Sequence, residues 1–142
     1  MNLYLDTSAL VKLYVEEEGS GTVREAVAGA DSVASSAIAY VEARAAFARR
    51  RRERRLSPAG YRRTLQELEV DWDHYLRVEI TSGLIRRAAE LVEVHALRAY
   101  DAIHLASATL LREHLQGPIR FACWDSTLLA AARREGLHLV RV

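Results

Sequence analysis

Residues 2–14 read NLYLDTSALVKLY, and this stretch decides the fold class. Residues 3–5 form a short apolar run, which predicts a buried strand that ends at Asp6. The apolar residues between 8 and 15 then recur with helical spacing. A buried strand that leads through one acid directly into a helix is typical of an α/β protein with parallel strands.

The same strand–helix alternation continues along the chain. Further strands are expected at 31–35, 76–80, 119–123 and 138–142, and helices at 8–15, 20–28, 38–55, 58–74, 82–96, 100–113 and 127–135. No internal repeat or long linker divides the chain. We therefore expect a single domain over residues 1–142, built as a three-layer α/β/α sandwich with a mostly parallel central sheet.

Composition narrows the class of protein. The 142 residues include one cysteine, Cys123, which excludes an intramolecular disulfide and a cysteine-rich zinc site. We expect a cytoplasmic protein, because the chain has no recognisable signal peptide and no apolar stretch long enough to span a membrane. The formal net charge of +1 conceals an asymmetry: residues 44–63 carry nine arginines and one acid, and the rest of the chain is acidic.

Two expected strands each end in an aspartate, Asp6 after residues 3–5 and Asp125 after residues 119–123. In open α/β sheets, ligands bind just beyond the carboxyl ends of the strands. Each aspartate also precedes a helix, so either one alone is equally well interpreted as a helix N-cap. Their occurrence together at one edge of the sheet favours a site.

Two further acids lie within expected helices. Glu42 shares a helical face with Ile38 and Ala46, which we expect to be the core-facing side, and Asp101 shares a face with Leu105. A carboxylate on an apolar face is costly unless it is paired or binds a cation. No base lies where a local ion pair with Glu42 would need it, whereas the helix macrodipole also explains an acid at the position of Asp101.

These four carboxylates have no basic partner evident in the sequence, and no Cys/His cluster accompanies them. Carboxylate oxygens are the ligands that Mg²⁺ and Mn²⁺ prefer. Such ions bridge an acidic site to a phosphate, lower the pKa of an attacking water and stabilise the charge on the displaced oxygen. The residues therefore point to metal-dependent hydrolysis of a phosphodiester bond.

The same residues carry a family resemblance. Residues 5–14 (LDTSALVKLY) resemble the opening motif of PIN-domain ribonucleases, above all the VapC-type toxins of bacterial and archaeal toxin–antitoxin pairs. Residues 40–42 (YVE), 97–106 (LRAYDAIHLA) and 124–125 (WD) are similar to the second, third and fourth motifs. The first and third motifs are the specific ones, and the order of the motifs spans essentially the whole chain.

The resemblance implies a PIN-like fold and an endoribonuclease that needs Mg²⁺ (or Mn²⁺). The acidic quartet that it implies as catalytic and metal-binding is Asp6, Glu42, Asp101 and Asp125. Ser8 matches a hydroxyl that assists the first acid, and Cys123 departs from the family pattern, which usually has Thr or Ser there. The resemblance also implies RNA as substrate, a cognate antitoxin as partner and a homodimer.

Residues next to the third acid have two interpretations each. Arg98 and Tyr100 are candidate RNA contacts, but an ion pair explains Arg98 equally well and core packing is the usual role of a tyrosine. His104 follows Asp101 by three residues and shares its helix face. We expect His104 to be a packed or surface histidine rather than a metal ligand.

The arginine run at residues 49–55 (RRRRERR) is the strongest local charge in the chain. Arg50 and Arg51 within it are candidate phosphate contacts for RNA. An acidic segment of an antitoxin is a second possible partner for the run. A solvated helix end, where cations are favoured by the macrodipole, explains it without any partner.

Three rival functions remain at this point. The chain is alternatively a PIN-fold RNA-processing nuclease that is not a toxin, or a non-catalytic module that binds metal or RNA. A phosphatase of the haloacid dehalogenase type also begins with a strand and an aspartate, but it needs a second aspartate where this chain has Ser8.

Overall fold

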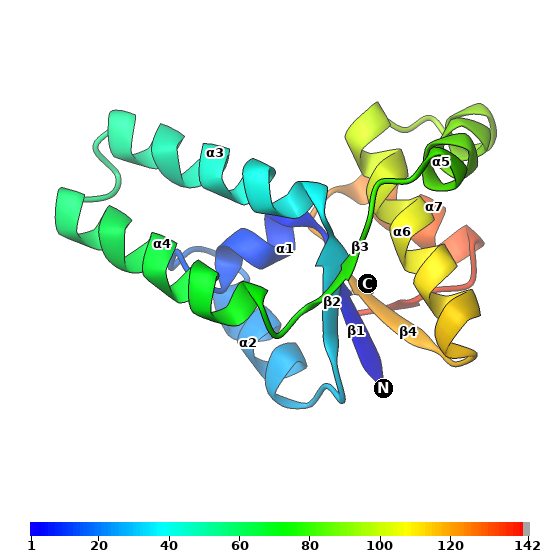
Figure 1. Ribbon diagram of the computed structural model, residues 1–142, viewed down its shortest axis with the longest axis horizontal. Coiled ribbons are helices and arrows are strands. Elements are labelled where there is room, and N and C mark those ends of the chain that lie inside the picture. The colour runs from blue at the N-terminus through cyan, green and yellow to red at the C-terminus, as the bar shows by residue number, and fades with distance from the viewer. Residues whose placement is uncertain (141–142) are drawn as a thin grey trace.

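The computed structural model describes residues 1–140, which form five strands and seven helices (Figure 1). In chain order these are β1 (Asn2–Leu5), α1 (Thr7–Lys12), α2 (Ser20–Ala28), β2 (Val33–Ser36), α3 (Ile38–Arg52), α4 (Pro58–Trp72), β3 (Leu76–Val78), α5 (Ser82–Val94), α6 (Ala99–Leu115), β4 (Ile119–Ala122), α7 (Ser126–Arg134) and β5 (His138–Leu139). None of the described helices has the length and apolar character needed to cross a membrane.

The five strands form one sheet with the order β3-β2-β1-β4-β5, and every neighbouring pair is parallel. The expected α/β sandwich is confirmed, with a sheet that is parallel throughout its described strands. The chain builds outward from β1 to β2 and β3, then returns to add β4 and β5 on the other side of β1. The carboxyl ends of β1 and β4 therefore flank the topological switch point, where α/β folds bind ligands.

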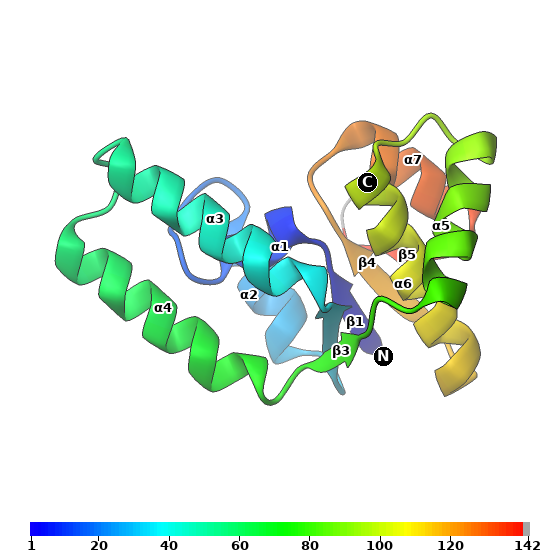
Figure 2. The same ribbon diagram turned by 45° about the horizontal axis from the view of Figure 1, so that its top comes forward.

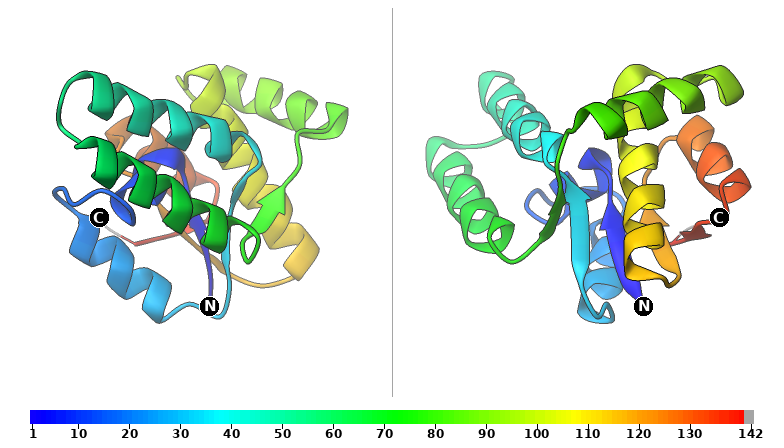
Figure 3. Two further views of the ribbon diagram at one scale, coloured as in Figure 1. Left: turned by 60° about the vertical axis from the view of Figure 1, so that its left-hand side comes forward. Right: turned by 45° about the vertical axis from the view of Figure 1, so that its right-hand side comes forward.

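Alternation along β1 separates two cores, one on each face of the sheet. Leu3 and Leu5 pack with Phe47 and the layer of α1 to α4. Tyr4 points to the opposite face, where its ring stacks on Phe121 with centroids 5.5 Å apart among residues of α5, α6 and α7. Figure 3 shows these two helix layers on either side of the strands.

The element boundaries follow the capping residues in the sequence. Ser57 and Thr81 cap α4 and α5 through their side chains, and Gly136 follows α7 with a φ of 83°. The helix expected to reach residue 55 ends at Arg52, and the strand expected over 76–80 ends at Val78. Of the last expected strand, residues 141 and 142 lie outside the described residues.

Helices α3 and α4 form a hairpin that extends away from the sheet (Figure 2). The face of α3 that packs on the core carries Ala39, Ala43 and Phe47. The expectation that Glu42 lies on that face is wrong: Glu42 is only half-buried, at its edge. Ile38 and Ala46 surround Glu42 with apolar residues in the sequence, but both are only partly buried, and the buried stripe of α3 lies beside them.

A partly buried ion-pair network braces the last turns of α3 against α1 and the loop that follows it. Glu17 accepts from Lys12 Nζ at 3.0 Å and from an Arg50 guanidinium nitrogen at 2.7 Å, through separate carboxylate oxygens. Lys12 Nζ also lies 4.9 Å from the centroid of the Trp124 ring. The side chains of Lys12 and Arg50 are only 10% and 17% exposed, so this network is partly shielded from solvent screening.

Gly19 and Gly21 give a matched test of this packing. Gly19 has a φ of 92°, and a Cβ there would lie 2.6 Å from Trp124 Cζ2, whereas a Cβ at Gly21 meets nothing within 4 Å. We expect Gly19→Ala to lower the free energy of unfolding by about 1–3 kcal/mol. Gly21→Ala, inside α2, should raise it by roughly 0.5–1 kcal/mol. Urea unfolding of both variants checks this, and equal effects at the two positions would contradict it.

Candidate active site

Asp6 follows β1 and caps α1. Its Oδ1 accepts hydrogen bonds from the Ala9 backbone N–H at 2.9 Å and from the Ser8 hydroxyl at 2.7 Å. Ser8 Oγ in turn accepts from the Trp124 backbone N–H at 3.2 Å, which ties the start of α1 to the end of β4. Burial raises the pKa of Asp6, and the charge of His104 and these hydrogen bonds offset only part of that effect. Asp6 is thus both a helix cap and a buried carboxylate whose charge is poorly compensated.

Asp125 occupies the corresponding position after β4 and caps α7, where its Oδ1 accepts from the Leu128 N–H at 2.8 Å. Asp101 lies in the first turn of α6 with its side chain 14% exposed. Arg98, which precedes α6, reaches both acids: its Nε is 3.1 Å from Asp101 Oδ2, and a terminal nitrogen is 3.9 Å from Asp125 Oδ2. One guanidinium therefore bridges two of the carboxylates.

Glu42 lies in the second turn of α3 and is held by side chains from two other elements. Thr7 Oγ1 donates to Glu42 Oε1 at 2.6 Å, and His104 Nε2 lies 3.0 Å from the same oxygen. His104 is buried on α6, and its Nδ1 is hydrogen-bonded to the Tyr4 hydroxyl at 2.8 Å. Burial works to raise the pKa of Glu42, but the hydrogen bonds from His104 and Thr7 and the charge of His104 outweigh it and lower that pKa.

The acids do have basic partners, contrary to expectation. Arg98 pairs with Asp101 and Asp125, and His104 pairs with Glu42. The partner of Glu42 lies 62 residues away in the chain, so no local spacing rule can find it. His104 is packed, as expected, and its contact with Glu42 is the functional feature that sequence reasoning missed.

Three of the carboxylates converge around the end of β4. Cys123 is fully buried there, and burial, together with the charges of Asp6, Asp125 and Asp101, raises the pKa of its thiol. The thiol therefore stays protonated and unreactive at neutral pH. Arg98 contacts both Asp101 and Asp125, and Ser8 links Asp6 to the Trp124 backbone beside Asp125, so β1, α6 and α7 bring their carboxylates to one region.

The donor set is suited to a hard divalent cation. Asp6, Asp101 and Asp125 offer carboxylate oxygens, and the buried charge of Asp6 is one that a cation would compensate. Within residues 1–140, no three His, Cys, Asp or Glu side chains are already arranged to hold a metal ion. Arg98 and His104 contact oxygens of the other three acids. The residues fit such an ion by chemistry once Arg98 has moved away from Asp101 and Asp125.

The four candidate RNA contacts lie in two different places. Arg98 and Tyr100 lie at the acid site, and both are exposed. Arg50 lies in the last turn of α3, in the ion-pair network described above, and is largely shielded from solvent. Arg51 lies on the α4 side of α3, with its guanidinium 5.3 Å from the centroid of the Tyr61 ring.

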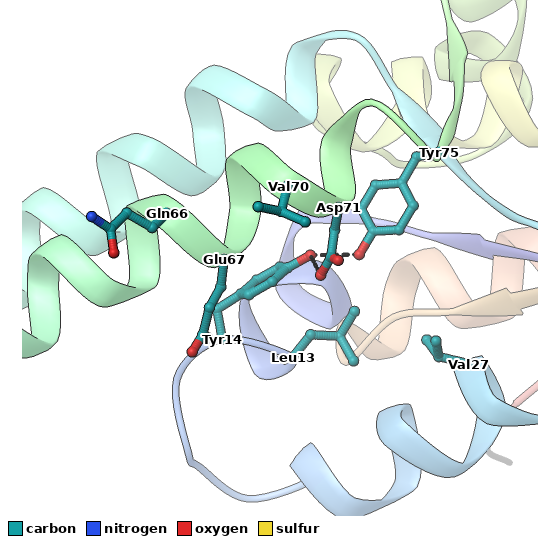
Figure 4. A pocket seen from close by; sticks show the side chains of 8 residues that line it. All are labelled: Leu13, Tyr14, Val27, Gln66, Glu67, Val70, Asp71 and Tyr75. Carbon is teal, nitrogen blue, oxygen red and sulfur yellow. Dashed lines mark hydrogen bonds between the residues drawn. The ribbon is translucent and has the colours of Figure 1, made fainter.

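A separate pocket of about 480 Å³ lies beside α4, away from the four acids (Figure 4). Its lining residues are Leu13, Tyr14, Val27, Gln66, Glu67, Val70, Asp71 and Tyr75. The Tyr14 hydroxyl donates to Asp71 at 2.8 Å and lies 2.5 Å from the Tyr75 hydroxyl. Burial raises the pKa of Tyr75 to about 12, so both hydroxyls stay neutral and the pocket offers hydrogen bonds without a nucleophile.

Comparison with known proteins agrees with this geometry. Residues 3–115 match the model of the PIN domain family. Ribonuclease VapC45 of Mycobacterium tuberculosis (strain CDC 1551 / Oshkosh) is 36% identical over 141 residues, which cover 96% of this chain and 93% of that protein. Ribonuclease VapC46 of the same species (strain ATCC 25618 / H37Rv) is 33% identical over 138 residues, covering 97% and 95% of the two chains.

Solved structures share the fold at lower identity. VapC20 of Mycobacterium tuberculosis, a sarcin–ricin loop cleaving toxin, has a TM-score of 0.67 at 18% identity, covering 91% of this chain and 94% of that one. A toxin–antitoxin complex from Klebsiella pneumoniae has a TM-score of 0.57 at 17% identity, covering 83% of both chains. With the family model matched over most of its length and relatives above 30% identity along nearly all of it, the chain belongs to the PIN-domain family, among the VapC-type ribonucleases.

Proposed function

We propose that this chain is a metal-dependent endoribonuclease that hydrolyses RNA phosphodiester bonds and acts as the toxin of a type II toxin–antitoxin pair. The observation that carries the proposal is the convergence of Asp6, Asp101 and Asp125 at the carboxyl ends of β1 and β4, where Arg98 and Ser8 link them. The similarity of this chain to VapC ribonucleases over nearly its full length supports RNA as the substrate.

The acidic quartet Asp6, Glu42, Asp101 and Asp125 would hold Mg²⁺ or Mn²⁺. When bound, such an ion activates water for attack on phosphorus and stabilises charge on the leaving oxygen. Ser8 fixes the orientation of Asp6 through the 2.7 Å hydrogen bond. Thr7 and His104 keep Glu42 ionised and turned toward the site.

Arg98 and Tyr100 are the proposed substrate contacts at this site. The guanidinium of Arg98 is exposed and suits a phosphate group, so it can exchange its carboxylate partners for the RNA backbone. The Tyr100 side chain, 59% exposed on the same turn of α6, offers a ring on which a base can stack. Both residues thus position the strand beside the carboxylates.

The proposal includes two protein partners, a cognate antitoxin and a second copy of the chain. Similarity to a chain of a toxin–antitoxin complex supports the first. Expression of the chain alone should arrest growth, and co-expression of the neighbouring antitoxin gene should relieve the arrest. RNA cleavage without growth arrest would instead favour a processing nuclease, and sedimentation of the purified protein measures its oligomeric state.

Asp6→Asn should abolish RNA cleavage and leave the protein folded. Asparagine keeps the Oδ1 acceptor for Ala9 and Ser8 but removes the negative charge. Asp73→Asn is the matched control, because Asp73 is an exposed aspartate at the end of α4. Gel assays of labelled RNA measure cleavage, and an active Asp6→Asn protein would refute the site.

The stability of Asp6→Asn should depend on pH in a defined direction. Because burial raises the pKa of Asp6, the folded protein binds this proton more tightly than the unfolded chain does. The stability that Asp6 contributes is present at low pH and is lost as pH rises through the raised pKa. Relative to the parent, Asp6→Asn should therefore gain stability from acidic to neutral pH in urea unfolding. An equal loss of stability at both pH values would show that Asp6 is only a structural cap.

Divalent ions should stabilise the folded protein as well as support cleavage. At a Mn²⁺ concentration of about 100 times its Kd, linkage adds about 2.7 kcal/mol to the free energy of unfolding. Asp101→Asn should lose this stabilisation, which thermal melts with and without Mn²⁺ measure independently of activity. Cleavage that persists in excess chelator would contradict the proposal.

Arg98→Gln should separate ion binding from RNA binding. Removing the guanidinium frees Asp101 and Asp125, so Mn²⁺ should bind a few-fold more tightly by calorimetry. The KM for RNA should rise because a phosphate contact is lost, with a smaller change in kcat. If neither quantity changes, Arg98 has no role at the site.

A further inference from the structure

The exposed face of α3 leads from the acid site to the tip of the hairpin and carries exposed arginines. Arg49 is seven residues beyond Glu42, close to two helical turns, so it lies on the same side of α3 about 10 Å further along the axis. Arg52 follows three residues later, and the residues that lie on this face between Glu42 and Arg49 are the small Ala45 and Ala46.

The arginines of this segment differ in how far their charges are already neutralised. Arg50 is held by Glu17 and Arg51 lies over a tyrosine ring, so both are engaged within the protein. Arg49 has a side chain 73% exposed, with one ion pair to Glu53 at 3.5 Å. Arg52 and Arg54 form no ion pair with any of residues 1–140.

The surroundings of these charges suit a polyanion better than a protein. Protein interfaces have an apolar core within a polar rim. In the described chain, the large exposed apolar side chains, such as Val41 and Val70, all lie outside residues 44–63. Exposed guanidinium groups match a phosphate backbone, which they bind through charge-assisted hydrogen bonds.

We propose that Arg49 and Arg52 of α3, with Arg54 at the hairpin tip, form a track that binds the RNA backbone beyond the acid site. The inference rests on the proposed function and adds to it how far along the protein the bound RNA extends. A strand whose scissile phosphate lies at the carboxylates would continue along α3 and reach Arg49 and then Arg52. The enzyme therefore prefers RNAs long enough to reach this track over minimal fragments.

The test compares two double variants with equal charge change. Arg49→Gln/Arg52→Gln removes the track, and Arg86→Gln/Arg134→Gln removes two exposed arginines on α5 and α7. Both are made in the Asp6→Asn background, which keeps the RNA intact. Fluorescence anisotropy with a long, labelled, single-stranded RNA of mixed sequence then gives affinity between about 50 and 200 mM KCl.

The plot of log K against log salt has a negative slope, and the track variant should make it less steep by about 1.4. Each single-strand phosphate contact contributes about 0.7 to the steepness, and two contacts are lost. The control should keep the parent slope. A track variant with the parent slope overturns the proposal. So does a variant that keeps its RNA slope but loses binding to polyglutamate, because the face would then fit an acidic protein segment.

Cleavage by proteins with Asp6 intact separates this proposal from the proposed function. On a long RNA, the track variant should show a raised KM with kcat retained, whereas a dinucleotide should be cleaved equally by the track variant and the parent. If the track variant loses cleavage activity equally on both substrates, the proposed track is overturned. A dinucleotide is too short to reach Arg49, so its cleavage should not change. Absence of cleavage by the parent protein refutes the proposed function, and the binding slopes still decide whether the track binds RNA.

Discussion

β1 is paired on both sides and covered on both faces, and this constraint determines where the acids can lie. Its residues Leu3, Tyr4 and Leu5 are almost completely inaccessible to solvent, so the chain leaves the sheet with Asp6 already buried. The raised pKa of Asp6 reflects the cost of that position. The capping bond to Ala9 and the Ser8 hydroxyl offset part of the cost, and a bound cation would offset more.

His104 and Arg98 hold the acids in different ways because the burial of their side chains differs. The side chain of His104 is 3% exposed and joins α6 to α3 through Glu42, so breaking this contact would disturb both layers of the molecule. The side chain of Arg98 is 78% exposed, and its ion pairs compete with solvent. The contact between His104 and Glu42 is therefore part of the folded core, whereas the ion pairs of Arg98 with Asp101 and Asp125 can be exchanged for other partners. In the proposed function, this difference would let a charged substrate replace the contacts of Arg98 while Glu42 stays in place.

Much of the architecture could be predicted from the sequence, because short apolar runs, capping residues and the position of Pro58 are local signals. The positions of Asp6 and Asp125 at strand ends were equally local, and both the capping and the site interpretations of Asp6 agree with its environment. The partner of Glu42 could not be predicted, since contact with His104 depends on where α6 crosses the sheet. The same limit applies to α3, whose buried stripe is chosen by α1 and α4 rather than by its own alanines.

The arginine run shows a further limit of composition. Six arginines within seven residues look equivalent in the sequence, yet the fold uses Arg50 to brace the hairpin through Glu17 and leaves Arg52 unpaired. Charge counts alone cannot separate a structural arginine from a free one.

The brace at Glu17 has an evolutionary consequence. Because Lys12 and Glu17 hold Arg50 and thereby anchor α3, the exposed charges of Arg52 and Arg54 contribute little to folding. Mutations at positions such as 52 and 54 are therefore nearly neutral for stability and exposed to selection on target choice. Duplicated copies of such a gene can diverge in the transcripts they attack while inheriting an unchanged catalytic centre.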